Sequence, residues 1–155
     1  MTVARNGREA GVLRVLVLAD DLIWATRLVG QLRTLGVDPV RLGSAEALEA
    51  ALGVPAGDDA GAGRPTHAVI DLTARAYDGL AAVRLATAAG LGVLCVGQHD
   101  DHAQRSAALT AGAERVFAYR KLFEDGHATL AAWLGVPAPA AASLAMPPSS
   151  EVPAR

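Results

Sequence analysis

The sequence predicts an α/β domain of three layers, a doubly wound (βα)5 chain built around a five-stranded parallel sheet. Between residues 12 and 134, short β-branched or leucine-rich runs alternate with longer alanine- and leucine-rich segments of helical period, which is the pattern of βα units. Three of the short runs are apolar throughout their centres, as strands covered by helices on both faces are. With 155 residues, 52% of them hydrophobic, the chain is expected to form one domain with its own core.

Five segments are expected to form the strands. They are residues 13–19, 38–42, 67–72, 92–96 and 115–119. The first, third and fourth carry the apolar centres, which places them inside the sheet. The second is the weakest strand, so we expect it at an edge.

A helix is expected after each strand. Asp21 is placed to cap the first helix, which ends near Gly36, because its carboxylate can accept from free backbone N–H groups. Ser44 is expected to cap the second helix, which runs through Leu52. The inward stripe of the first helix is expected to be Ala25, Leu28, Leu32 and Leu35. The other helices are expected at 79–89, from Asp100 or Asp101 to the residue before Gly112, and at 122–134.

The two ends of the chain and one internal segment are not expected to belong to the packed domain. Residues 1–11 are interpreted as a flexible N-terminus and residues 53–65 as a glycine-rich loop insertion. Residues 135–155 are interpreted as a disordered tail rich in alanine and proline, since five of the eight prolines lie after residue 135. The domain itself is expected to span residues 12–134.

Charge and cysteine content narrow the range of functions. The 16 acidic and 14 basic side chains give a formal net charge of -2, so direct nucleic-acid binding through phosphate neutralisation is not expected. A single cysteine excludes an internal disulfide framework and favours a reducing compartment. Arg14 interrupts the N-terminal apolar run and prolines break the apolar stretch near the C-terminus. We therefore expect a cytoplasmic protein that does not interact with membranes.

Three carboxylates are expected at one edge of the sheet. Asp20 and Asp21 follow the first strand, and Asp71 closes the third. The carboxyl ends of parallel strands meet at the same edge, where doubly wound proteins bind ligands. Two carboxylates about 5 Å apart repel by roughly 3 kcal/mol at an effective dielectric near 20, so the cluster favours a proton, a cation or more solvent. A hard cation such as Mg²⁺ would satisfy it, with Asp20, Asp21 and Asp71 as candidate ligands.

Four motifs carry a resemblance to a known family. They are VLVLADD, AVIDLTARAYDG, VLCVGQHDD and LTAGAERVFAYRKLF. Together they resemble the receiver domain of two-component response regulators, the CheY-like domain, which has the flavodoxin-like fold. The resemblance implies that Asp71 is a phospho-acceptor for a histidine kinase and that Asp20 and Asp21 hold Mg²⁺. It also implies that Gly79, eight residues after Asp71, is the loop-closing glycine.

The chain departs from the family pattern at the positions that respond to phosphorylation. Gly97 stands where receivers carry a serine or threonine, and Tyr119 stands where they carry a lysine. Val116 falls on the position of the switch aromatic, and Arg75 replaces a proline in the loop after Asp71. A tyrosine supplies a hydrogen-bond donor but no positive charge near neutral pH.

A second register of the last strand is open from the sequence. A slip of one residue makes Phe117 the aromatic and places Arg120 at the lysine position. In the first register, Tyr119 either hydrogen bonds to Asp71 or fills the space left by Gly97. Arg120 and Lys121 either reach the carboxylates or remain solvated at the strand end.

These departures predict an atypical, degenerate receiver domain in two-component or phosphorelay signalling. It keeps the acidic pocket, is not an enzyme, and acts mainly through protein contacts. One alternative is an active single-domain phosphoacceptor that takes phosphate from a histidine kinase onto Asp71. Another is a doubly wound domain that binds a small molecule in the space near Gly97.

The expected partner is a histidine kinase or another signalling protein. A homodimer through the fourth helix, fifth strand and fifth helix is a further expectation. Trp24 lies off the inward stripe of the first helix, so it is either an exposed anchor for a partner or a residue that packs against the last helix. Arg120 is the other residue assigned to a partner surface. The histidines and aspartates of 99–102 are interpreted as a capped helix start rather than a metal site.

Overall fold

The computed structural model of the chain describes residues 12–53 and 63–139. Strands and helices alternate along these residues. The elements are β1 (Arg14–Leu18), α1 (Leu22–Thr34), β2 (Asp38–Leu42), α2 (Ala45–Gly53), β3 (Pro65–Asp71), α3 (Gly79–Ala88), β4 (Gly92–Gly97), α4 (His102–Ala111), β5 (Arg115–Ala118) and α5 (Tyr119–Leu134).

The strands form one parallel sheet in the order β2-β1-β3-β4-β5. The predicted fold class is confirmed, and the strand at 38–42 lies at an edge as expected. The chain runs outward from β1 to β2 and then returns to β3 on the other side of β1. The carboxyl ends of β1 and β3 therefore flank the point where the strand order reverses, which is where this architecture binds ligands.

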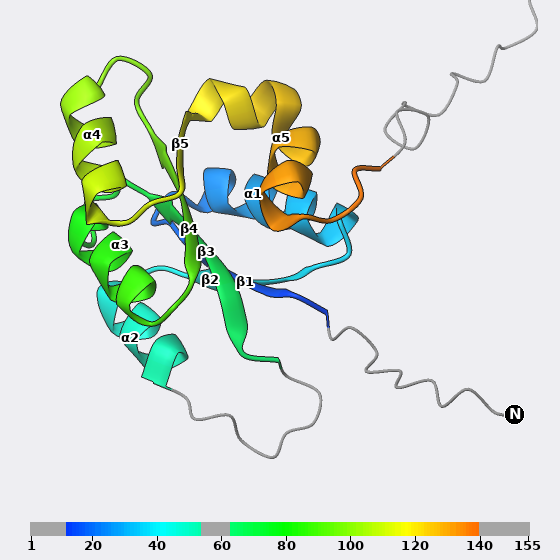
Figure 1. Ribbon diagram of the computed structural model, residues 1–155, viewed down its shortest axis with the longest axis horizontal. Helices are drawn as coiled ribbons and strands as arrows, with labels where there is room; N and C mark the ends of the chain where they lie inside the picture. The colour runs from blue at the N-terminus through cyan, green and yellow to red at the C-terminus, as the bar shows by residue number, and fades with distance from the viewer. Residues whose placement is uncertain (1–11, 54–62, 140–155) are drawn as a thin grey trace, which may run out of the picture.

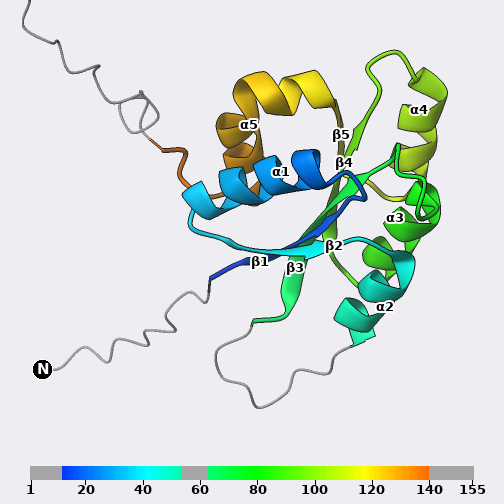
Figure 2. The same ribbon diagram turned by 180° about the vertical axis from the view of Figure 1, so that it is seen from behind.

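Helices cover both faces of the sheet. Figures 1 and 2 show α1 and α5 on one face and α2, α3 and α4 on the other. Each face has its own apolar core, with Val17, Leu28 and Leu122 in one and Leu16 and Leu48 in the other. Leu16 and Val17 are neighbours in β1 and belong to different cores, because successive side chains of a strand point to opposite faces.

The predicted helix caps are present. The side chains of Asp21, Ser44 and Asp101 each accept a hydrogen bond from a backbone N–H of the following helix, at 3.0, 3.1 and 2.9 Å. Asp101, rather than Asp100, caps α4. This confirms the expectation of a capped helix start at 99–102. Gly112 follows α4 with a φ of 117°, a left-handed conformation that favours glycine.

The last helix differs from the expectation. It begins at Tyr119 instead of residue 122, and it bends at Asp125, where φ is -140° and ψ is 31°. The buried side chain of Gln31 in α1 donates from Nε2 to the Leu122 carbonyl at 2.9 Å. A side chain that bonds to a helix carbonyl in this way is a recognised cause of a local bend. The bond ties α5 to α1 over the face that they share.

Several predicted segments lie outside the described residues. They are the N-terminus at 1–11, most of the loop insertion at 53–65, and the part of the tail from 140 onward. Among the described helices, none is both long enough and apolar enough to cross a membrane.

Cys95 is expected to be unreactive in the folded protein. It lies in β4 with no exposed surface, and burial raises the pKa of its thiol to about 12. Since the thiolate is the reactive form, iodoacetamide at pH 8 is expected to leave Cys95 unmodified in the native state and to alkylate it in urea. The mass of the intact protein measures the extent of alkylation. If Cys95 of the folded protein were alkylated as fast as in urea, this would show that the reagent reaches β4.

Candidate functional site

The candidate site is built around Asp71, the last residue of β3. Its side chain is buried, with 3% of the residue exposed. The Oδ1 atom accepts hydrogen bonds from the backbone N–H and the hydroxyl of Thr73, both at 2.8 Å. A buried carboxylate is costly unless its oxygens are hydrogen bonded, and the turn after β3 supplies these donors locally.

Tyr119, the first residue of α5, also hydrogen bonds to Asp71. Its hydroxyl donates to Asp71 Oδ1 and also contacts the Thr73 hydroxyl. Burial and the hydrogen bond to Asp71 both raise the pKa of Tyr119 well above its ordinary value, so the phenol stays protonated and remains a donor at neutral pH. We call Asp71, Thr73 and Tyr119 the hydroxyl–carboxylate triad.

Aromatic residues hold the Tyr119 ring in place. The ring of Trp24 packs edge-on against it, with centroids 4.9 Å apart, and the Phe123 ring lies 5.1 Å from Trp24. Arg27 stacks over Phe123 at 4.2 Å from the ring centre. Trp24 is only 4% exposed, so the prediction of an exposed partner anchor is wrong at this position. The alternative holds: Trp24 packs against α5, at its first turn.

The other two carboxylates face different donors. Asp20 Oδ2 accepts from the backbone N–H groups of Arg75 and Ala76, at 2.8 and 3.1 Å. Asp21 uses its Oδ1 to cap α1. Asp20 thus fastens the loop between β3 and α3 to the end of β1, and Asp21 has a helix-capping role that any strand-to-helix turn could need.

The expected metal group is not assembled by these residues as they lie. Within the described ranges, no set of three or more His, Cys, Asp or Glu side chains is placed to hold a metal ion. An oxygen of each aspartate is committed to a neighbouring N–H or O–H group. The assignment of Asp20, Asp21 and Asp71 as metal ligands stays a prediction.

Gly97 ends β4, and its missing side chain is replaced in space by Gln104 of α4. A Cβ atom built at Gly97 would lie 3.2 Å from Gln104 Oε1. The Gln104 amide donates from Nε2 to the Leu72 carbonyl at 3.1 Å. Leu72, the residue after Asp71, is therefore linked to α4 by the Gln104 side chain. The family pattern has a serine or threonine hydroxyl at the position of Gly97 instead.

Tyr77 ties the loop after Asp71 to the sheet from inside. Its buried hydroxyl lies 2.8 Å from the carbonyl oxygens of both Leu18 and Asp71, at the ends of β1 and β3. Burial and the nearby Asp71 charge raise the pKa of Tyr77 far above its ordinary value. The sequence interpretation did not single out Thr73, Tyr77 or Gln104. An aromatic residue with a polar tip in a loop next to Asp71 was the available signal for Tyr77.

Tyr119 and Arg120, the two candidates for the lysine position, are the first two residues of α5, and Tyr119 is the one that reaches Asp71. The Arg120 side chain is 84% exposed and pairs with Glu124 at 2.7 Å, and Lys121 pairs with Asp125 at 3.1 Å. Val116 is buried in the core under α2, α3 and α4, whereas Phe117 packs on the opposite face. The cations at the start of α5 are therefore solvated, as the second interpretation of Arg120 and Lys121 expected.

Comparisons with known proteins agree with this architecture. No protein-family model matches the sequence, and no curated protein matches it. Among solved structures, a response regulator receiver protein from Burkholderia phymatum is 25% identical with a TM-score of 0.67, over 82% of this chain and 98% of that one. A two-component response regulator from Clostridium difficile is 13% identical with a TM-score of 0.67, over 79% and 96%.

A third similar structure contains ligands. It is a response regulator protein from Burkholderia pseudomallei with a phosphorylated aspartic acid, a calcium ion and citrate, 18% identical with a TM-score of 0.62. The match covers 78% of this chain and 66% of that protein's length. The chain has the fold of CheY-like receiver domains, with an aspartate at the end of β3.

Proposed function

We propose that this chain is a receiver-like module of two-component signalling that works mainly through protein contacts, with phosphorylation of Asp71 slow or absent. The single observation that carries the proposal is the Tyr119 hydroxyl on Asp71 Oδ1. The function of the similar structures, response regulators, supports the signalling role. We propose no enzymatic turnover by the chain itself.

The hydroxyl–carboxylate triad explains why phosphoryl transfer is disfavoured. A phosphoryl group adds between one and two negative charges to the aspartate, and fixed positive charge nearby stabilises both the transition state and the product. Tyr119 brings a neutral donor in place of a cation, and the basic side chains of Arg120 and Lys121 are paired with Glu124 and Asp125. Attack through Asp71 Oδ1 also requires this oxygen to leave hydrogen bonds with Thr73 and Tyr119.

The path from Asp71 to the surface is altered as well. In the family pattern, a hydroxyl at the position of Gly97 contacts the phosphoryl group, and glycine cannot do so. Gln104 instead bonds the Leu72 carbonyl, and neither partner in this bond belongs to Asp71. We infer that the surface around α4 is held in one arrangement, which suits a constitutive contact with a partner better than a phosphate-driven switch.

The proposed partner is a histidine kinase or another signalling protein. A second copy of the chain, bound through α4, β5 and α5, is the other arrangement that we propose. β5 is an edge strand, so this part of the sheet has no neighbouring strand on its outer side among the described residues.

A phosphodonor tests the proposal directly. The protein is incubated with acetyl phosphate and a magnesium salt, and intact mass is followed over time beside the Asp71→Asn variant. We expect the two proteins to show the same, near-background gain of phosphoryl groups. Rapid and stoichiometric phosphorylation of the natural protein, absent from Asp71→Asn, would falsify the proposal and favour the active phosphoacceptor.

We also propose that Mg²⁺ binds this rim only weakly. A metal bound by Oδ2 of Asp20 would compete with the backbone N–H groups of Arg75 and Ala76, which donate to this oxygen at 2.8 and 3.1 Å. We expect no saturable shift of the Asp20, Asp21 and Asp71 amide resonances below about 10 mM Mg²⁺, which corresponds to a binding free energy of about -2.7 kcal/mol. Saturation in the micromolar range, lost in Asp20→Asn, would show that the carboxylates rearrange to form the metal group.

A further inference from the structure

A pocket of about 480 Å³ opens beside the hydroxyl–carboxylate triad, between the loop after β4 and the first turn of α5. Its floor lies at Gly97 and Ala118, which pair across the ends of β4 and β5. Gly97 has no side chain and Ala118 has only a methyl group, so neither strand end projects a large side chain into the pocket. None of the three aspartates at the rim lines this pocket, and Tyr119 is the residue that it shares with the triad.

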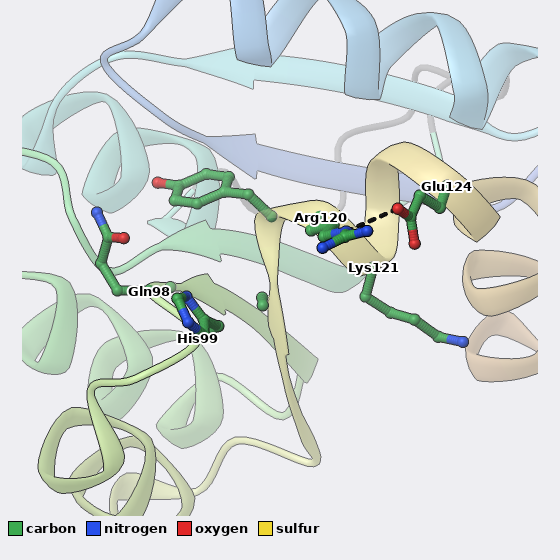
Figure 3. Close-up of a pocket in the computed structure, with 8 residues that line it drawn as sticks. Gln98, His99, Arg120, Lys121 and Glu124 are labelled. Atoms are coloured by element: carbon green, nitrogen blue, oxygen red, sulfur yellow. Dashed lines mark hydrogen bonds and ion pairs between the residues drawn. The ribbon is translucent and has the colours of Figure 1, made fainter.

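Polar groups enter the pocket from two sides. Figure 3 shows Gln98 and His99 on the loop after β4 and Arg120 and Lys121 on the start of α5, with the Arg120 side chain directed to Glu124. Arg120 and Lys121 bring cationic groups, and the His99 ring brings a hydrogen-bond donor. The pocket wall thus presents donors from both the loop and the helix.

The acidic residues near the pocket only partly offset this charge. Glu124 is the one carboxylate among the lining residues and is paired with Arg120 at 2.7 Å. Lys121 pairs with Asp125 at 3.1 Å, and the two side chains of this pair are each about half exposed. Exposed pairs of this kind contribute little free energy, so the two cations can turn to a ligand at small cost.

The start of α5 adds to the preference for an anion. Ala118 is the N-cap of α5 and has no side-chain oxygen to accept from the first backbone N–H groups. These groups belong to residues that line the pocket. Unfilled N–H donors at a helix start favour negative charge, here in support of the side chains already described. Tyr119, whose ring packs edge-on against Trp24, is also a lining residue of the pocket.

We propose that this pocket binds a small organic anion, one with a phosphate or carboxylate head and an apolar body that packs on the Tyr119 ring. The head would contact Arg120, Lys121 and His99. Such a ligand would touch the residue that holds Asp71 and would act on the triad without any phosphoryl transfer. This inference goes beyond the proposed signalling role, and binding can be measured whether or not that role is correct.

The test uses amide NMR of the full chain with three probes: phenyl phosphate, benzoate and the uncharged benzyl alcohol. We expect phenyl phosphate or benzoate at millimolar concentration to shift the amides of residues 97–99 and 118–121, with little effect of benzyl alcohol. The acid that binds more tightly identifies the preferred head group, phosphate or carboxylate. The variant Arg120→Gln/Lys121→Gln is expected to bind about tenfold more weakly, a loss of about 1.4 kcal/mol. These side chains are exposed, so the variant is expected to fold.

Controls separate this site from the others. Arg105→Gln removes an exposed charge from α4 away from the pocket and is expected to bind as the natural protein does. Asp71→Asn is expected to keep the shifts at 97–99 and 118–121. The proposal is overturned by equal shifts with benzyl alcohol, by no shift with either acid, or by binding that Arg120→Gln/Lys121→Gln leaves unchanged. Shifts confined to residues 20, 21 and 71 would also overturn it, by moving the anion to the rim.

Discussion

The substitution Trp24→Ala is expected to destabilise the domain by about 3–5 kcal/mol, the usual cost of removing a large buried aromatic side chain. Trp24 is 4% exposed and lies between Tyr119 and Phe123, where α1 meets the first turn of α5. Its loss leaves a cavity there and removes an edge-to-face contact that holds the Tyr119 ring. The free energy of unfolding is measured by urea denaturation, followed by far-ultraviolet circular dichroism because the change also removes a fluorophore.

Trp133→Ala provides the matched control. Trp133 is also on the α1–α5 face of the sheet but is half-buried, with an edge-on contact to His67 at 4.9 Å between ring centres. We expect a smaller loss of stability than for Trp24→Ala, because Trp133 buries less apolar surface than Trp24 does. A loss below about 1 kcal/mol for Trp24→Ala would be far outside the range for a buried tryptophan. It would show that Trp24 is exposed in solution and would revive its interpretation as a partner anchor.

The substitution Tyr119→Lys is expected to increase the rate of phosphorylation of Asp71 by about a hundredfold. A lysine at this position replaces a neutral hydroxyl with an ammonium group beside Asp71 Oδ1. One well-placed group that stabilises developing charge contributes about 10²- to 10³-fold to a reaction rate. The rate is measured as the gain in intact mass with acetyl phosphate and Mg²⁺.

Arg120→Lys is the control for Tyr119→Lys. It places a lysine one residue further along α5, where the side chain is 84% exposed and paired with Glu124. We expect it to phosphorylate as slowly as the natural protein, and we expect Asp71→Asn to remove the gain in Tyr119→Lys. If Arg120→Lys were the faster variant, the chain would use the slipped register, with residue 120 facing Asp71. If neither variant were faster, charge at this position would not limit the reaction.

Most of the architecture was accessible from local patterns. Strand 38–42 matches its prediction at both ends, and the caps at Asp21 and Ser44 are where the sequence placed them. These features depend on alternating apolar runs and on single polar residues at helix starts, which neighbours in sequence largely determine. The start of α5 was predicted three residues late, because Tyr119 reads as the end of an aromatic strand until its hydroxyl is seen to turn toward Asp71.

The misplacement of Trp24 has a geometric cause. A helix that lies on a sheet alone buries a narrow stripe, and the predicted stripe began at Ala25. In the structure α1 also packs against α5, so its buried surface is wider and includes Trp24, Val29 and Gln31. A second packing partner cannot be inferred from the period of one helix.

The sequence predicted only part of the hydroxyl–carboxylate triad. The sequence placed Asp71 at the end of the third strand and left open whether Tyr119 bonds to it or fills space. The partner Thr73 lies two residues from Asp71, yet its role depends on the turn that directs its hydroxyl back to Oδ1. The three aspartates show another case: topology brings Asp20, Asp21 and Asp71 to one edge, and the tertiary structure gives each a different hydrogen-bond donor.

By itself the sequence determined the strand and helix order, the doubly wound class and the acidic character of one sheet edge. The tertiary structure alone decided which oxygen each aspartate presents, that Tyr119 rather than Arg120 meets Asp71, and that Gln104 occupies the space above Gly97. The physical reason is range. Periodicity and capping act over three or four residues, whereas the long-range hydrogen bonds of the site join residues 32 to 59 positions apart, and only the packed sheet brings them together.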